Sequence, residues 1–269
     1  MNRTTNGVFA LQYASRSVSV RGEHFHGYTP TCHEQYPIDY YIWAICRPDD
    51  VVVVDAGFTR QAALERGNRD YLADPSELLG LLGRNVEEVS TVVLSHLHYD
   101  HTGHVAGFPH AQIHVQRREH EFWNGPFANR GLFPHLHTAA DIVTIDALID
   151  AGRVVLDDGD VVVDETLSLH LVGGHTPGMQ VVKVATDDGP VVLAADASHF
   201  YENFEEDKPY AILTDLLEMY AAFDRLHELA GADGVVVPGH DPLVRQRHEV
   251  LADTGGLVTV LRPPGASTR

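Results

Sequence analysis

The sequence is poor in cysteine and contains no long apolar run. Cys32 and Cys46 are the two cysteines among 269 residues, so at most one disulfide can form and a disulfide framework is excluded. A reducing cytoplasm is the simplest location for such a chain. No run reaches the roughly 20 apolar residues that span a bilayer, so we expect no membrane association. Residues 1–20 lack an unbroken apolar segment and a convincing cleavage site, which argues against a signal peptide.

Basic residues are also scarce. The chain has 19 Lys and Arg against 38 Asp and Glu, a formal net charge of −19. Such a surface repels phosphate backbones, so we expect no nucleic-acid partner. The length and the 44% hydrophobic content allow a sizeable core. We expect a single domain over residues 1–269 with a frayed end from about Arg262. The sequence leaves a monomer and a homodimer both open.

Five short β-branched runs are each followed by Asp or His. Continuous apolar runs of this length are typical of strands buried on both faces, in sheets covered by helices. Because loops at strand ends gather side chains from distant parts of the chain, we expect these polar residues to share one rim. The runs are VVVVDAG with Asp55, TVVLSHLH with His96, LSLHLVGGH with His175, VVLAADAS with Asp196 and GVVVPGH with His240.

Helical patterns lie between these runs. Residues 74–85, DPSELLGLLGRN, carry a helix start signal and a Gly-containing end. From Leu216 to Leu226 apolar residues recur at helical spacing, which predicts a long amphipathic helix covering a sheet. Residues 119–150 mix aromatics, Gly and Pro, so we expect an irregular excursion there. A pocket wall, a lid and an ordinary surface loop remain alternatives for it.

The stretch SHLHYDHTGH concentrates imidazoles and a carboxylate. His96 and His98 are two residues apart, so in an extended segment they face the same way. Asp100 and His101 follow where the chain is expected to turn into a helix. Neutral imidazole suits zinc, copper, iron and nickel, and a carboxylate can bridge two cations. The stretch therefore predicts the beginning of two adjacent metal sites.

The separated motifs together resemble the metallo-β-lactamase superfamily from about residue 40 to residue 245. The resemblance implies an α/β fold, a four-layer αβ/βα sandwich with a metal site at its open edge. It implies two Zn²⁺ ions, with other divalent metals open, and a supporting carboxylate at Asp55. The implied ligands are His96, His98 and His175 for the first metal, Asp100, His101 and His240 for the second, and Asp196 as the bridge.

Within the superfamily the chain is most similar to N-acyl-homoserine lactonases, on the segments SHLHYDH, VQRREHEF, DASHFYENFEEDKPYA and PGHD. This resemblance implies an enzyme that opens a lactone ring of a small-molecule substrate, by attack of a hydroxide shared between two metals. Three alternatives remain open. They are a hydrolase of another lactone, a thioesterase similar to glyoxalase II, and an iron-dependent oxidoreductase with one metal.

One position departs from the lactonase pattern. The group usually has Tyr three residues after the bridging Asp, where it can contact the substrate carbonyl, and this chain has His199. His199 and Tyr201 are therefore alternative candidates for that role, and Asp100 is a candidate catalytic residue as well as a ligand. His24, His26 and His33 lie in an N-terminal loop that could also reach the site. We expect most other histidines, His104 among them, to be surface or packing residues.

Overall fold

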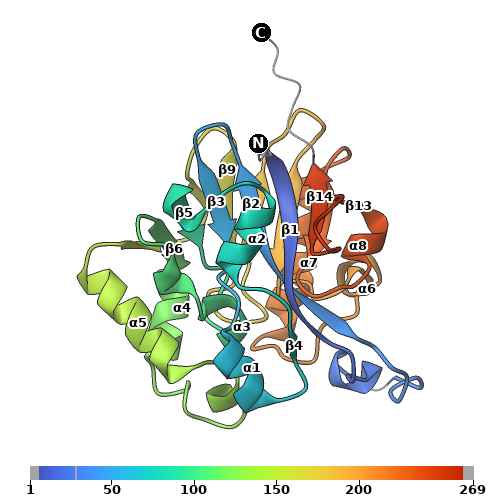
Figure 1. The fold of residues 1–269 in the computed structure, drawn as a ribbon. Coiled ribbons are helices and arrows are strands. Elements are labelled where there is room, and N and C mark those ends of the chain that lie inside the picture. Colours follow the sequence, from blue (N-terminus) through green and yellow to red (C-terminus); the bar gives the residue numbers. More distant parts are fainter. Residues whose placement is uncertain (1–5, 28, 263–269) are drawn as a thin grey trace.

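The computed structural model describes residues 6–27 and 29–262, and within them two β-sheets pack face to face (Figure 1). The first sheet has the strand order β13-β14-β1-β2-β3-β5-β6-β7, with β4 paired to β1. Its strands are β1 Gly7–Arg16, β2 Ile38–Cys46, β3 Val51–Val54, β4 Asp70–Tyr71, β5 Val89–Val93, β6 Gln112–Gln116, β7 Val154–Asp157, β13 Glu249–Val250 and β14 Val258–Arg262.

The second sheet has the order β12-β11-β10-β9-β8. Its strands are β8 Val161–Val162, β9 Leu167–Leu171, β10 Gln180–Val184, β11 Val191–Ala195 and β12 Val235–Pro238. All five apolar runs of the sequence form strands, but they are divided between the sheets, with β3 and β5 in the first and β9, β11 and β12 in the second.

Helices cover both sheets. On the first sheet, α2 packs on β1, α4 packs on β6 and β7, and α5 packs on β7. On the second sheet, α7 packs on β11 and β12. The order helix, sheet, sheet, helix confirms the predicted four-layer αβ/βα sandwich. The helices are α1 Arg60–Arg66, α2 Pro75–Leu81, α3 Tyr99–Thr102, α4 Arg117–Trp123, α5 Ala139–Asp150, α6 Tyr201–Glu205, α7 Leu216–Ala230 and α8 Val244–Arg247. Short 3₁₀ turns are η1 Arg21–Glu23, η2 Val86–Glu88, η3 Val105–Gly107 and η4 Phe133–His135.

The amphipathic pattern of α7 places it as predicted. Asp215 caps the helix by accepting from the amides of Leu217 and Glu218, a typical N-terminal arrangement. Phe223 and Leu226 are buried against the second sheet. Burying an apolar side chain of this size contributes about 1.5–3 kcal/mol, so the apolar face holds the helix on the sheet.

The expectation for residues 119–150 was wrong over much of its length. The end of α4, the turn η4 and the whole of α5 lie in it, and α5 alone spans Ala139–Asp150. Thr and Ile have modest helix propensity, and packing decides here, because Ile142 and Ile145 are buried.

Three expectations concern disulfide bonding, membrane-spanning helices and the C-terminal end of the chain. Cys32 and Cys46 are not bonded to each other. In the part of the chain that the structure describes, no helix is long and apolar enough to cross a membrane. The frayed end expected from about Arg262 lies outside the described residues, apart from Arg262 itself, which ends β14.

Candidate metal centre

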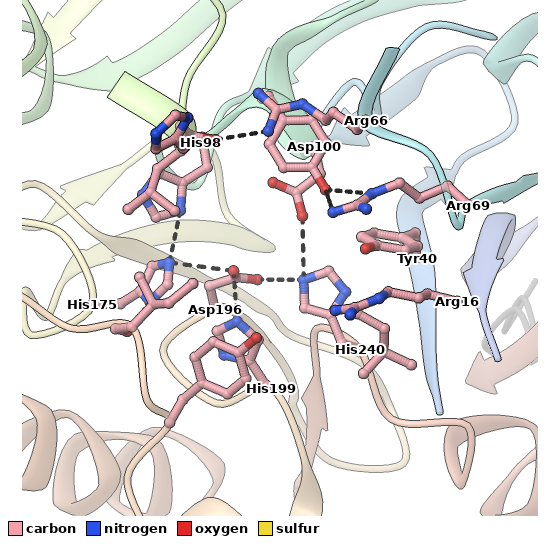
Figure 2. A pocket seen from close by; sticks show the side chains of 16 residues that line it. Arg16, Tyr40, Arg66, Arg69, His98, Asp100, His175, Asp196, His199 and His240 are labelled. Atoms are coloured by element: carbon pink, nitrogen blue, oxygen red, sulfur yellow. Dashed lines mark hydrogen bonds and ion pairs between the residues drawn. The ribbon is translucent and has the colours of Figure 1, made fainter. Parts of the chain in front are cut away.

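The histidines and carboxylates that follow the apolar strands converge at one edge of the sandwich (Figure 2). Three segments come from the second sheet and carry His175, Asp196 and His240. The first sheet contributes the segment after β5, which leads through His96 into the short helix α3. Tyr13 of β1 donates its hydroxyl to the carbonyl of Asp100 at 2.7 Å and holds α3 in place.

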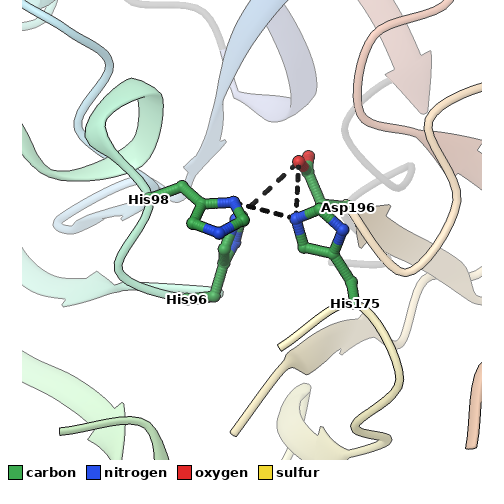
Figure 3. A group of neighbouring side chains, drawn as sticks. All are labelled: His96, His98, His175 and Asp196. Carbon is green, nitrogen blue, oxygen red and sulfur yellow. Dashed lines mark hydrogen bonds and ion pairs between the residues drawn. The ribbon is translucent and has the colours of Figure 1, made fainter. Parts of the chain in front are cut away.

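The first group of possible ligands is His96, His98, His175 and Asp196, all buried (Figure 3). Nδ1 of His98 and Nε2 of His175 are 2.9 Å apart. Ligand nitrogens of a tetrahedral zinc site, with bonds of about 2.0–2.1 Å, lie about 3.3 Å from one another. The group therefore has the compactness and the donor types of a zinc site.

The second group is Asp100, His101 and His240. Nε2 of His101 lies 3.8 Å from Oδ1 of Asp100, and Nε2 of His240 lies 3.9 Å from its Oδ2. Two imidazoles and a carboxylate thus face a common point beside the first group. These are ligands that zinc and other divalent transition metals accept.

Asp196 lies between the two groups and faces both. Its Oδ2 lies 3.7 Å from Nε2 of His96 and 3.3 Å from Nε2 of His175. Its Oδ1 lies 3.3 Å from Nε2 of His101 and 2.9 Å from Nε2 of His240. One carboxylate therefore offers a separate oxygen to each group, which is the geometry of a bridging ligand.

Several of the converging atoms are buried without a hydrogen bond from the described residues. They are Nε2 of His96, Nε2 of His101 and Oδ1 of Asp196, whose 2.9 Å approach to Nε2 of His240 lacks hydrogen-bond geometry. A buried polar atom without a partner is destabilising by about 1–3 kcal/mol. A cation at the centre of each group would satisfy these atoms, so the donor set fits two metal ions.

The ring nitrogens on the far side of the ligands are held by protein groups. Nδ1 of His101 lies 2.7 Å from Oδ2 of Asp55. Nδ1 of His175 donates to the carbonyl of Ile212 at 2.8 Å, and that of His240 to the carbonyl of Asp39 at 2.9 Å. Such contacts fix the tautomer and leave Nε2 free for a metal. Asp55 thus supports the centre from outside the two ligand groups.

Two residues at the strand ends adopt left-handed backbone conformations. Asp55 has a φ of 62° and Ala195 a φ of 42°. This region is uncommon for residues other than glycine. The turn at Ala195 directs Asp196 into the site. Gly239 packs closely against this turn. A side chain at position 239 would not fit, because its Cβ would lie 2.7 Å from the carbonyl oxygen of Ala195.

Burial and neighbouring charges shift the pKa values of the ligand histidines in opposite directions. Burial, reinforced by neighbouring imidazoles, lowers the pKa of His96 and His98 well below the usual value. These rings are therefore neutral, the form that binds a metal. Burial also lowers the pKa of His101, but Asp55 and Asp196 outweigh it and the pKa rises well above the usual value.

His199 faces the centre. Its Nε2 lies 3.0 Å from Oδ2 of Asp196. Its ring stacks on Tyr210, with the ring planes 6° from parallel. Burial lowers the pKa of His199 well below the usual value, against the opposing effect of Asp196, so the ring is neutral near pH 7.

Tyr201 lies elsewhere, and the alternative role considered for it does not fit its position. As the first residue of α6 it is buried with its hydroxyl 3.2 Å from Nε2 of His248. The guanidinium of Arg247 lies 3.7 Å from the centre of its ring. Tyr201 lines a separate hollow beside α7 together with Phe204 and His227.

The described residues of the N-terminal loop approach the site, and none of them belongs to the ligand groups. His24 is buried, donates from Nε2 to the carbonyl of Tyr36 at 3.0 Å, and stacks on Tyr210. His26 and His33 are exposed. His104 lies 3.1 Å from the hydroxyl of Tyr71, a packing position as expected.

Glu119 is a site residue that sequence reasoning did not single out. It is fully buried in α4, and its carboxylate accepts from the amide of Leu97 at 3.0 Å and from the amide of Gly178 at 2.8 Å. Nε1 of Trp123 donates to it at 2.7 Å. Glu119 therefore connects the loop of His96 and His98 with the loop of His175. An isolated Glu between charged residues gives no sign of burial.

A cavity of about 140 Å³ lies over the ligands. His98, Asp100, His175, Asp196, His199 and His240 form its floor. Its walls are Arg16, Ile38, Tyr40, Arg66, Arg69, Tyr99, His135, Leu136, Tyr210 and Ile212. Part of the segment 119–150 is therefore a pocket wall, at His135 and Leu136.

The family model of the metallo-β-lactamase superfamily matches residues 37–245. The chain belongs to the metallo-β-lactamase superfamily. This result confirms the resemblance seen in the motifs, which lie within the matched range, and it agrees with the four-layer fold.

Relatives of this superfamily member include N-acyl homoserine lactonases. The AttM lactonase of Rhizobium johnstonii is 30% identical over 225 residues, covering 77% of this chain and 83% of the relative. That of Azorhizobium caulinodans is 34% identical over 167 residues, covering 60% of this chain and 61% of the relative, less than two thirds of its length. These relatives support the predicted class, a metal-dependent hydrolase of ester bonds.

Solved structures share the fold of this superfamily member. A quorum-quenching N-acyl homoserine lactone lactonase has a TM-score of 0.69 at 22% identity, covering 90% of this chain and 95% of that one. The dizinc quorum-quenching lactonase AidC, in complex with a product, has a TM-score of 0.67 at 19% identity, covering 90% of each chain.

Proposed function

We propose that this protein is a dinuclear zinc hydrolase that opens lactone rings, with N-acyl homoserine lactones as the first substrates to test. The observation that carries the proposal is the position of Asp196, whose two carboxylate oxygens face different ligand groups. The lactonase relatives support the substrate class. Two zinc ions held by these groups would supply hydroxide at neutral pH and polarise the lactone carbonyl.

The protein's own residues orient the substrate and move a proton. Opening the ring adds one water: its oxygen bonds to the carbonyl carbon, the ring C–O bond breaks, and a proton reaches the leaving alcohol oxygen. Asp100 lines the cavity with a carboxylate, and we assign it that proton transfer in addition to metal binding. Neutral His199 also lies in the cavity floor. Its Nε2 lies 3.0 Å from Oδ2 of Asp196, and we propose that this N–H turns to the carbonyl oxygen of a bound substrate.

Metal content is the first test. Elemental analysis of the purified protein should find about two zinc ions per chain, as a two-metal hydrolase requires. Asp196→Ala should lower both occupancies, because one carboxylate faces both groups. Asp224→Asn, an exposed change on α7, is the control and should leave the metal content unchanged. A single iron without hydrolytic activity would favour the oxidoreductase alternative.

A substrate panel is the second test. N-acyl homoserine lactones, other lactones, thioesters and β-lactams are supplied to the zinc-loaded protein. We expect lactones to be opened fastest, with products heavier by one water in mass spectrometry. Efficient thioester cleavage without turnover of any lactone would reject the proposal in favour of a thioesterase.

A further inference from the structure

Three arginines gather on one wall of the cavity. Arg16 ends β1, Arg66 ends α1, and Arg69 follows that helix closely. All three line the cavity. Figure 2 shows them on the side of Asp100 and His240, opposite His175, with Tyr40 between Arg69 and Arg16.

The charge of this wall is positive, whereas the net charge of the whole chain is negative. Acidic residues outnumber basic ones, 38 to 19. Among the described residues that line the cavity, the acidic ones are Asp100 and Asp196, and both belong to the ligand groups. Away from the ligands, the charged lining is therefore arginine only.

The hydrogen bonds of Arg66 and Arg69 go to neutral acceptors, and carboxylates act on these arginines only at longer range, Asp141 on Arg66 and Asp100 on Arg69. Arg66 donates to the carbonyls of His135 and His137. Arg69 donates to the carbonyl of Gly67 and to the hydroxyl of Tyr99. These acceptors are neutral, and within the described ranges neither guanidinium has a carboxylate at ion-pair distance.

Arg16 is only partly compensated. One of its terminal nitrogens donates to Glu23 at 2.5 Å. Its Nε is buried and donates no hydrogen bond to any described residue. Because an arginine has five N–H donors in a planar fork, this side chain retains donors for a further acceptor.

The cavity is small for a complete ligand site. Ligand pockets commonly enclose about 300–1,000 Å³, against about 140 Å³ here. This space suits a compact ring with a short substituent. An anion in it would lie near three guanidinium groups, whose positive charges attract it.

We propose that the physiological substrate is a compact lactone that carries a carboxylate, and that Arg16, Arg66 and Arg69 bind this carboxylate. The inference rests on the proposed lactonase function and names its substrate class. Guanidinium groups match carboxylates in charge and in the spacing of their donors. Hydrolysis adds one water to the ring ester, so the substrate monoanion becomes a hydroxy-dicarboxylate and one proton is released.

The test compares two lactones that differ only in charge. γ-Butyrolactone bearing a carboxylate next to the ring oxygen is paired with the corresponding carboxamide, which is neutral and similar in size. The wild-type zinc enzyme should have a kcat/KM about 10- to 100-fold higher for the carboxylate, and added salt should reduce this preference. Arg16→Gln and Arg69→Gln should each reduce the preference about tenfold, because each removes one charge-assisted contact.

A binding measurement makes the test independent of turnover. Tetrahydrofuran-2-carboxylate and tetrahydrofuran-2-carboxamide lack the scissile ester and are titrated calorimetrically into the same proteins. The carboxylate should bind the wild type more tightly than Arg16→Gln or Arg69→Gln. Arg60→Gln, at the exposed start of α1, is the matched control and should bind like the wild type. Metal content and thermal midpoint are checked for every variant.

The outcomes separate the two proposals. Equal kcat/KM for the two lactones, or a carboxylate that binds the arginine variants as tightly as the wild type, would overturn the arginine site, since the metals alone would then hold the anion. If no lactone is hydrolysed, the lactonase function fails, whereas loss of tetrahydrofuran-2-carboxylate binding in the variants would still assign the arginines to an anion. Variants that lose metal are replaced by Arg69→Lys, which keeps the charge and should keep most of the preference.

Discussion

Oδ2 of Asp55 lies 2.7 Å from Nδ1 of His101, on the side of the ring that faces away from the ligand nitrogen. Asp55 is itself fixed, because the amide of Ser95 donates to its Oδ1 at 2.7 Å and the hydroxyl of Ser95 to its Oδ2 at 2.9 Å. The carboxylate of Asp55 therefore connects the end of β3 to Ser95. It also connects both of these segments to His101 of the second ligand group.

Asp55→Asn should weaken the second metal site. Asn keeps the size of the side chain and tolerates the left-handed backbone at φ 62°, so the change removes the charge and one of the two acceptor oxygens that face Ser95 and His101. Loss of an outer carboxylate typically lowers metal affinity about 10- to 100-fold. Competition with a chelator, followed by elemental analysis, should find one zinc retained and the other lost first. Equal loss of both ions would contradict a role confined to His101.

His199→Ala and Tyr201→Phe should differ sharply. His199 is part of the cavity floor, whereas the hydroxyl of Tyr201 faces His248. Removing one donor to a developing oxyanion typically lowers kcat about 10²–10³-fold, and we expect this for His199→Ala at unchanged metal content. Tyr201→Phe should retain nearly all activity. Full activity in both variants would mean that no side-chain donor acts at this position.

Glu119→Gln should destabilise the protein. Burial raises the pKa of Glu119, while hydrogen bonds from Leu97, Trp123 and Gly178 oppose the shift. The amide of Gln carries its own N–H groups, so at least one of the three donors loses its acceptor. We expect a loss of about 2–3 kcal/mol in unfolding free energy, measured by urea denaturation.

The matched control for Glu119→Gln is Glu121→Gln, an exposed position on the same helix. It should change the unfolding free energy by less than about 0.5 kcal/mol. Similar losses in the two variants would show that the helix, and not the buried carboxylate, is responsible.

Glu202 makes a pH-dependent contribution to stability. It accepts from Arg21 at 2.8 Å, Tyr36 at 2.9 Å and Lys208 at 2.6 Å. The hydrogen bond from Arg21 is the main reason that the pKa of Glu202 falls to about 2. The folded pKa is lower than the value of about 4.3 in an unfolded chain, so the stabilisation is present above that value and is lost as the pH falls towards 2.

Glu202→Gln should therefore lower the unfolding free energy at pH 6 by about 1–2 kcal/mol, an amount limited by solvent screening. The difference from wild type should shrink between about pH 4.3 and pH 2. Urea denaturation at several pH values measures it. Glu206→Gln, an exposed neighbour that also contacts Lys208, should have a much smaller effect. A difference that grows as the pH falls would reverse the sign and reject this assignment.

Local sequence pattern by itself determined the parts of this protein that depend on short-range order. The alternation and turn in residues 96–101 placed two histidines on one face and Asp100 and His101 in a helix start, and α3 begins at Tyr99. The apolar runs became strands, and the spacing from Leu216 became α7. Each of these follows from burial of a continuous or periodic apolar face, a property of neighbouring residues.

Only the tertiary structure decided the rest. Packing between sheets assigned the five strands to two different sheets, stabilised α5 against its modest propensity, and buried Glu119 between two ligand loops. The direction of α6 turned Tyr201 away and left His199 at the centre. Arg16, Arg66 and Arg69 share no motif. They meet because β1 and α1 end at the same edge of the sandwich, and contacts between distant segments depend on packing that no short stretch of sequence encodes.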